Sequence, residues 1–223
     1  MVTKEAASAV GVTPEAVLNV RGNSHRDVEP DFAVISVEVS ERGPNARDAS
    51  SAAQLIADSL REVLNASDGV RESNLSRLRV DETLDWDQAT NRQIPTGWQA
   101  QLFGTATVEV GDVNEVIAEI IESGARISTC EWRIERTHPE YRIVRSEAVK
   151  DALHAAHDFA SALGRDLGDL VSLSDPGLSS STAGILVHAA KQAEYAGGAE
   201  SSVEVDQQPV PIDASVEATF RVS

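Results

Sequence analysis

The sequence predicts an α+β fold, and three patterns in its 223 residues support this prediction. Apolar and polar residues alternate in three runs, which is typical of half-buried strands; the runs are 31–40, 98–110 and 212–222. Apolar residues recur every three or four positions in two further runs, which is typical of helices with one buried face; these are 49–64 and 143–163. The order strand, helix, strand therefore occurs twice before the long helix, which predicts two similar halves on one antiparallel or mixed sheet.

The two halves are predicted over residues 31–83 and 98–136. Residues 1–16 are expected to form a flexible N-terminal leader, Val17–Arg21 a first strand, and residues 22–30 a polar loop. The strand that follows places four apolar side chains on one face: Ala33, Ile35, Val37 and Val39. Gly43-Pro44-Asn45 ends this strand and the helix begins. Leu75–Thr83, which is only partly apolar, is expected to be an outer or short strand.

The second half begins after a polar loop expected over residues 85–97. Trp98–Val110 has the clearest alternation in the chain and should pair with Leu75–Thr83 as an antiparallel hairpin. Asp112, with Glu115 three residues later, predicts a capping box at the start of the next helix.

Gly124 is expected to end that second helix. The strand that follows is predicted over Arg126–Arg136, where Cys130 alternates in phase with Trp132 and Ile134. Cys130 should therefore point toward the apolar side of the sheet.

A long alanine-rich helix is predicted from Pro139 to about Leu163, because proline is favoured in a first helical turn. Its inward residues are expected to be Ile143, Val144, Ala148, Ala152, Ala155, Ala156, Phe159, Ala160 and Leu163. Gly164 and Gly168 are interpreted as helix-capping residues, and Leu170–Leu173 as a short strand. A Ser- and Gly-rich insertion follows at about 175–211, with a helix predicted over 183–195, before the closing strand.

Composition excludes several classes of function. The formal net charge of −17 disfavours nucleic acid and anionic membranes, because such binding depends on Lys and Arg. A single cysteine excludes an intramolecular disulfide and a Cys-rich metal site. The chain shows no secretory signal and no run of about 20 apolar residues, so we expect a soluble, cytoplasmic protein without membrane insertion.

The order of elements resembles the SIMPL domain family, a bacterial family of unknown function that includes periplasmic immunogenic antigens and proteins linked to oxidative-stress defence. The resemblance covers residues 17–223 and rests on these segments: Val17–Gly22, Pro30–Ala33, Gly97–Ala100, Gly124-Ala125, the alanine-rich helix with Leu163-Gly164 and Leu167-Gly168, and Pro211–Val222. It implies one α+β domain and no catalytic residues. Some relatives assemble into large ring-like or channel-like oligomers, so the resemblance implies a homo-oligomer. The secreted members carry a leader peptide, which we do not expect from the N-terminal residues of this sequence.

Two groups of residues could serve an enzyme. His154 and His157 lie three apart on the predicted helix with Asp151 and Asp158 nearby, and could offer two imidazoles and a carboxylate to a metal. The pair lacks the glutamate and third ligand of a metalloprotease motif, which favours an ordinary helix surface. A second group, Ser179–Ser181 with His188, lies in the insertion without a Gly-x-Ser-x-Gly turn, so a preorganised triad is not expected.

Cys130 is the remaining candidate, as a thiol redox sensor with Arg126 and Arg133 near it in sequence. Its phase in the strand favours a buried structural thiol instead. The sequence therefore predicts no catalytic, cofactor-binding or metal-binding residue and no cofactor. We expect a non-enzymatic protein that self-assembles or binds a protein partner, in connection with stress; a metal-dependent or hydrolytic enzyme and a redox sensor are the alternatives.

Overall fold

The computed structural model describes residues 16–88, 91–175 and 204–223, which divide into two compact units. Unit 1 contains the described residues 16–26, 139–175 and 211–223, and unit 2 contains residues 27–88, 91–138 and 204–210. Each unit has its own sheet. The α+β class predicted from the sequence is confirmed, whereas the single domain over residues 17–223 stays a prediction.

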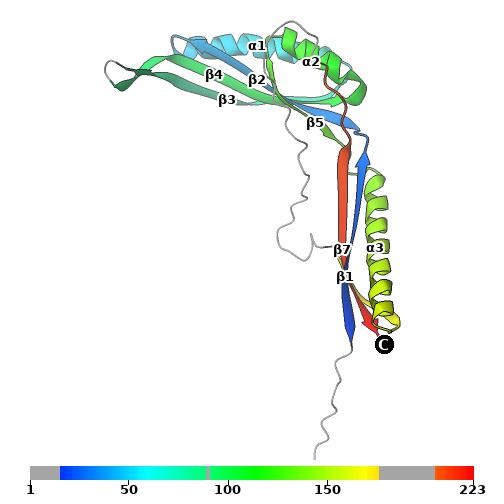
Figure 1. The fold of residues 1–223 in the computed structure, drawn as a ribbon. Helices are drawn as coiled ribbons and strands as arrows, with labels where there is room; N and C mark the ends of the chain where they lie inside the picture. The colour runs from blue at the N-terminus through cyan, green and yellow to red at the C-terminus, as the bar shows by residue number, and fades with distance from the viewer. Residues whose placement is uncertain (1–15, 89–90, 176–203) are drawn as a thin grey trace, which may run out of the picture. The chain divides into compact units, whose positions relative to one another are not determined.

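Unit 2 is a four-stranded antiparallel sheet with helices on one face (Figure 1). Its elements are β2 (Phe32–Gly43), α1 (Ala46–Ala66), β3 (Val70–Asp87), β4 (Arg92–Glu109), the 3-10 turn η1 (Val110–Asp112), α2 (Val113–Glu122) and β5 (Arg126–Arg133). The strand order is β3-β4-β2-β5. The two predicted strand-helix-strand halves, and the hairpin that joins them, are therefore confirmed.

The core of unit 2 lies between the sheet and α1 and α2. It contains the predicted apolar face of β2, and α1 contributes Ala49, Ala53, Ala57, Leu60 and Leu64. The Asn45 side chain accepts a hydrogen bond from the Asp48 backbone N–H at 3.0 Å, so that this helix begins where the turn after β2 ends. Gly124 follows α2 with a positive φ of 88°, as a terminating glycine should.

Three predictions in unit 2 are wrong. β3 and β4 extend through most of the loop predicted over 85–97, because the two strands pair with each other beyond the point where β2 ends at Gly43. β5 ends at Arg133, three residues early. Asp112 forms no capping hydrogen bond, because it continues the 3-10 turn with ψ near 0° and lacks the extended backbone of a capping residue.

Unit 1 is a three-stranded sheet covered on one face by one helix (Figure 1). Its elements are α3 (Glu140–Ala162), β6 (Leu167–Ser174), most of β1 (Val17–Val28) and most of β7 (Val210–Val222), with the strand order β1-β7-β6. Alanines of α3 pack against Val20, Val216 and Phe220 of the sheet. The long alanine-rich helix and the closing strand are confirmed.

Close approach of β1 to α3 depends on Gly22. A Cβ atom at this position would lie 2.0 Å from the Ala148 carbonyl oxygen and 2.4 Å from the Ala152 backbone nitrogen. Only a residue without a side chain fits there. One end of this contact is further held by Arg26, which pairs with Glu140 at 3.0 Å and Glu147 at 2.6 Å.

Strand ends in unit 1 also differ from the prediction. β1 continues to Val28 through the predicted loop, since its polar side chains are matched across the sheet and to α3: Arg21 pairs with Glu217, and the Asn23 N–H donates to Asp151. β6 begins at Leu167, so Gly168 lies in a strand, close to Arg221, and does not cap the helix. Gly164, with φ of 63°, does end α3 as predicted.

The inward face of α3 is narrower than predicted. Its fully buried side chains are spaced four apart: Val144, Ala148, Ala152, Ala156 and Ala160. Ile143, Phe159 and Leu163, which were expected to point inward, are exposed by 39%, 56% and 65%. The helix that was predicted over residues 183–195 lies outside the described residues, as does most of the insertion.

Candidate functional site

The histidines proposed as metal ligands lie on the solvent face of α3. His154 and His157 are both exposed, as is Asp158, and Asp151 accepts the Asn23 backbone N–H at 2.9 Å. Across the part of the chain that the structure describes, no group of three or more His, Cys, Asp or Glu side chains is placed to hold a metal. Two imidazoles one helical turn apart are only half of a tetrahedral ligand set. The serines and His188 of the second enzyme candidate lie outside the described residues.

Cys130 lies on β5 and packs against the core of unit 2. Burial and, to a smaller extent, the nearby Glu131 carboxylate raise the pKa of its thiol to about 11. A redox-sensing thiol requires the opposite shift, because the thiolate is the reactive form. Arg126 and Arg133, which are close in sequence, therefore do not activate it.

Alkylation of native Cys130 should be slow at neutral pH and accelerate only as the pH approaches about 11. At pH 8 we expect iodoacetamide to react roughly 100-fold more slowly than with a free cysteine, in proportion to the smaller thiolate fraction. The pH profile of labelling, followed by mass spectrometry, measures this directly.

The chain unfolded in urea is the control, since its thiol should regain an ordinary pKa. If Cys130 of the native protein is labelled at pH 7 as fast as in urea, the thiol is not buried, and the redox-sensor hypothesis is favoured. The raised pKa of Cys130 also makes the stability of the fold depend on pH, because folding favours the neutral thiol. This stabilising contribution is fully present below the unfolded pKa, at about pH 8.5, and is lost as the pH rises through the folded pKa of about 11.

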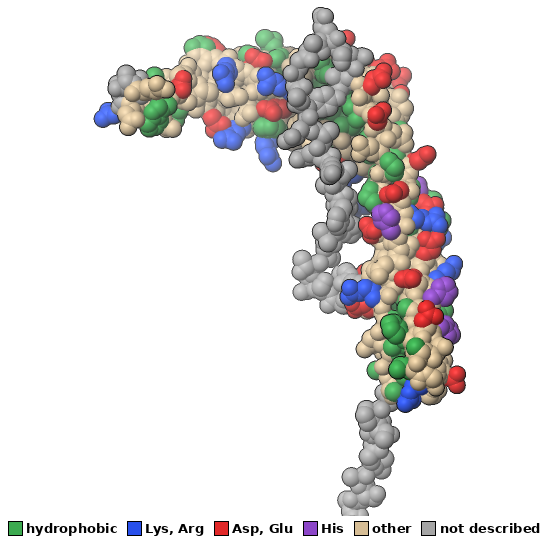
Figure 2. Space-filling view, viewed as in Figure 1, with side chains coloured by type: hydrophobic (Ala, Val, Ile, Leu, Met, Phe, Trp, Pro, Cys, Tyr) green, Lys and Arg blue, Asp and Glu red, His purple; other side chains and the backbone are tan. Residues whose placement is uncertain are grey.

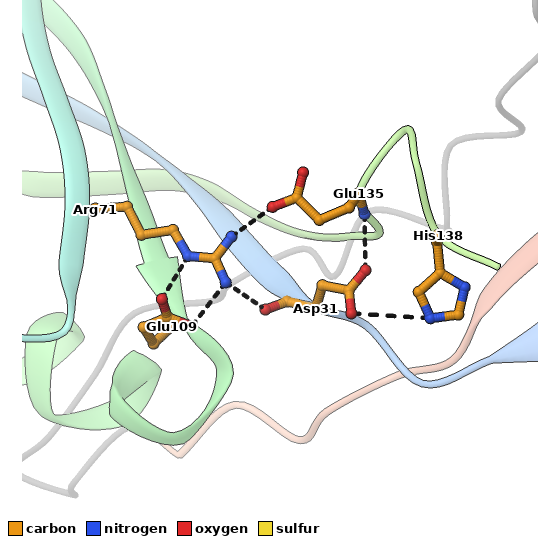
Figure 3. Close-up of polar contacts among 5 residues, drawn as sticks. All are labelled: Asp31, Arg71, Glu109, Glu135 and His138. Atoms are coloured by element: carbon orange, nitrogen blue, oxygen red, sulfur yellow. Dashed lines mark hydrogen bonds and ion pairs between the residues drawn. The ribbon is translucent and has the colours of Figure 1, made fainter.

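A cluster of charged residues in unit 2, which the sequence analysis missed, is centred on Arg71 (Figure 3). Its guanidinium binds both oxygens of Glu109, at 2.5 and 2.7 Å, and one oxygen of Glu135 at 2.7 Å. It also donates to the Asp31 carbonyl oxygen at 3.2 Å and lies 5.2 Å from the ring centroid of Phe32. These contacts join the start of β2, the start of β3, the end of β4 and the segment after β5.

Electrostatics of this cluster favour a structural role. Hydrogen bonds to Glu109 raise the pKa of Arg71, and the same bonds lower the pKa of Glu109. The Asp31 carboxylate accepts the Glu135 backbone N–H at 2.8 Å and lies 3.9 Å from His138. All three nitrogens of the Arg71 guanidinium therefore donate hydrogen bonds to oxygen atoms of the protein itself, which leaves the group poorly placed to bind a ligand. Because its partners are 38 and 64 residues away in sequence, no local motif could have revealed it.

An open polar cleft of about 940 Å³ lies in unit 2, where β2 ends beside the β3–β4 hairpin. Its lining includes Arg42, Arg79, Asp81, Gln99 and Gln101. Most of these groups bind each other or the neighbouring strand: Arg79 pairs with Asp81, and the two glutamines donate to Ser40 and Glu38, each at 2.8 Å. Such internally matched polar groups provide little free bonding capacity for a small ligand.

The least expected surface is apolar and lies in unit 1. We define the β6 patch as the exposed hydrophobic side chains of β6 with those at the end of α3: Phe159, Leu163, Leu170, Val171 and Leu173. All are between 48% and 65% exposed. Figure 2 shows hydrophobic side chains gathered over this end of unit 1. Single exposed hydrophobic side chains are ordinary, whereas five in β6 and at the end of α3 form a candidate interaction surface.

Backbone pairing leaves the same strand open. Among the described residues, β6 pairs only with β7 and is an edge strand of the three-stranded sheet. Asp169 is its only charged residue, although charges on edge strands are a common protection against pairing with other chains. Apolar side chains and free backbone groups thus occur on one strand, and this combination suits protein–protein contact.

Comparison with known proteins identifies one family. The family model named SIMPL, described as a protein of unknown function (DUF541), matches residues 18–220. No curated protein matches the chain. Among the described helices, none has the length and apolar character needed to span a bilayer.

Proposed function

The chain belongs to the SIMPL family, whose function is unknown, and from this premise we propose that it works by self-association and not by catalysis. In this proposal two copies meet at the β6 patch. The observation that carries it is the open edge of β6, with Leu170, Val171 and Leu173 about half exposed beside the apolar end of α3. The candidate catalytic groups give no comparable support, because the described histidines lack a third ligand and the thiol is deactivated.

A second copy fits this surface for two reasons. The first is charge: each chain carries a net charge of −17, so two copies repel except where their surfaces are nearly uncharged. β6, with one carboxylate in eight residues, is such a surface. The second is backbone bonding, since antiparallel pairing of β6 with the partner's β6 would satisfy both open edges through one two-fold axis.

Leu170→Asp should lower the mass of the assembly. The new carboxylate would be desolvated without a partner at the contact, so we expect association through the patch to weaken by about 100-fold or more. Light scattering behind a sizing column, at micromolar protein, measures the mass of wild type and variant under the same conditions.

Leu55→Asp is the matched control, because Leu55 lies on α1 of unit 2 and is 74% exposed. It introduces the same charge on another apolar surface residue and should leave the mass unchanged. Wild type that runs as a strict monomer at all salt concentrations would refute self-association. An equal loss of mass in both variants would show that added charge alone, and not the patch, is responsible.

A further inference from the structure

A different edge strand, in unit 2, has a self-complementary sequence. β3 is the outer strand of the order β3-β4-β2-β5 and is 18 residues long. Its inner side pairs with β4, and no strand of the described residues pairs with its outer side. Beyond Gly43, where β2 ends, the β3–β4 hairpin continues as two strands alone (Figure 1). A two-stranded sheet is only marginally stable by itself, so pairing with a further strand would stabilise this extension.

One face of β3 bears a row of apolar side chains. Leu78, Val80, Leu84 and Trp86 are separated by even numbers of residues and share a face, with Glu82 in the middle of the row. Leu78, Leu84 and Trp86 are each more than half exposed. Figure 2 shows hydrophobic side chains on the projecting part of the hairpin. Exposed tryptophan is unfavourable in water and is enriched among residues that dominate protein interfaces.

The other face of β3 is charged, and the two signs are separated. Arg77 and Arg79 come first, and Asp81 and Asp85 follow. Arg77 has no ion pair among the described residues, whereas Arg79 pairs with Asp81 along its own strand. A strand that is basic in its first part and acidic in its second part is complementary to itself when it is turned end for end.

We propose that β3 pairs antiparallel with the β3 of a second copy, centred on Glu82. In this register Leu78 stands opposite the partner's Trp86, and Val80 stands opposite the partner's Leu84. On the charged face, Arg79 stands opposite the partner's Asp85. The two-fold axis repeats each pair, and the two four-stranded sheets become one sheet of eight strands.

Competing registers lose these matches. Moving the centre by two residues to Val80 places Leu78 opposite the partner's Glu82, which sets an apolar side chain against a carboxylate. Moving it by one residue to Asp81 keeps Leu78 opposite the partner's Leu84 and Arg77 opposite the partner's Asp85. It places Val80 opposite the partner's Glu82 and Arg79 opposite the partner's Thr83, so an apolar pair and the Arg79 ion pair are lost. The centre on Glu82 has one unfavourable contact, between the two copies of Glu82 themselves, and this contact supplies a specific test.

This contact is separate from the β6 patch, which lies in unit 1, and does not depend on it. The test therefore uses the full-length Leu170→Asp variant as the parent protein. Association through the β6 patch is weakened in this parent, so the association that remains reports on β3. Arg79→Asp and Asp85→Arg, each added alone, should weaken the remaining dimer by about 30-fold, because each places like charges opposite one another twice. Analytical ultracentrifugation measures the dissociation constants, and circular dichroism checks that each variant is folded.

Mixing the two variants is the decisive measurement. A heterodimer of Arg79→Asp with Asp85→Arg has opposite charges at both positions, so the mixture should regain association to within a few-fold of the Leu170→Asp parent. Simple loss of folding or of general charge balance cannot produce this rescue. Glu82→Gln, which removes the like-charge contact on the axis, should tighten the parent dimer by about 3-fold or more.

The outcomes separate the two contacts. A Leu170→Asp protein that is monomeric while wild type associates would overturn the β3 pairing and leave the β6 patch supported. Equal association of wild type and Leu170→Asp would overturn the β6 patch. If the parent dimerises but the mixed variants stay monomeric, the proposed register of β3 is wrong.

Discussion

Gly22→Val is expected to destabilise unit 1 by about 3 kcal/mol, the upper part of the usual range for an overpacked site. The atoms nearest to the new side chain are backbone atoms of α3, at 2.0 and 2.4 Å from the position of its Cβ. A rotamer change cannot relieve a clash with backbone, so β1 and α3 must move apart. That movement would open the cluster in which Ala148 and Ala152 are almost completely buried.

Hydrogen exchange of α3 amides, measured by mass spectrometry, reports this loss. Tryptophan fluorescence would not, because the three tryptophans lie at positions 86, 98 and 132, all in unit 2. Gly111→Ala is the control, since a Cβ there meets nothing within 4 Å, and its protection should equal that of wild type. Unchanged α3 protection in Gly22→Val would mean that β1 and α3 do not approach as closely as the structure has them.

Leu60→Ala should cost unit 2 about 3 kcal/mol of stability. Leu60 is fully buried between α1 and the sheet, and its truncation leaves a cavity that close-packed neighbours fill only in part. Urea unfolding followed by tryptophan fluorescence measures the change, because Trp98 and Trp132 pack against the same core.

Leu55→Ala makes the same chemical change on the same helix, where the side chain is 74% exposed. Its effect should stay within about 0.5 kcal/mol, as is usual for surface positions. Comparable losses at both positions would indicate that helix propensity, and not burial, accounts for the cost at Leu60.

The elements that the sequence predicted correctly are those that bury one face. β2, β4 and β7 alternate because α-helices cover one side of each, and α1 has its apolar stripe for the same reason. In these segments the alternation or periodicity in the sequence matches the burial in the folded protein. The sequence pattern alone is therefore sufficient to predict the element. Membership of the SIMPL family, inferred from the order of these segments, is likewise confirmed.

Strand segments without a buried apolar face were missed. Residues 22–28 lack alternation because Ser24 and Arg26 meet the Glu147 carboxylate of α3, a partner more than 120 residues away. The hairpin beyond Thr83 has no helix over it, so its side chains are not buried on one face. Its sequence therefore lacks the alternation of buried and exposed residues that identifies a strand. Its strands become recognisable only from pairing, with Leu84 opposite Pro95 and Trp86 opposite Gln93.

The candidate surfaces were only partly predictable. The charge order of β3 is visible in the sequence, but it becomes meaningful only once the strand is known to be long and at the sheet edge. The β6 patch was hidden by an error: Phe159 and Leu163 were assigned to the core because they fit a broad helical stripe. The buried stripe of α3 repeats every four residues and is narrow, which leaves both side chains outside it.

Alanine and glycine at the contact between α3 and its sheet have a calorimetric consequence. The cluster holds seven buried residues, four of them alanine, whereas eleven of the eighteen buried residues in the core of unit 2 are isoleucine, leucine or valine. The heat-capacity change of unfolding scales with the apolar area that becomes hydrated, and alanine contributes little. The stability of unit 1 should therefore vary less steeply with temperature than that of unit 2, with a shallower curve and weaker destabilisation in the cold.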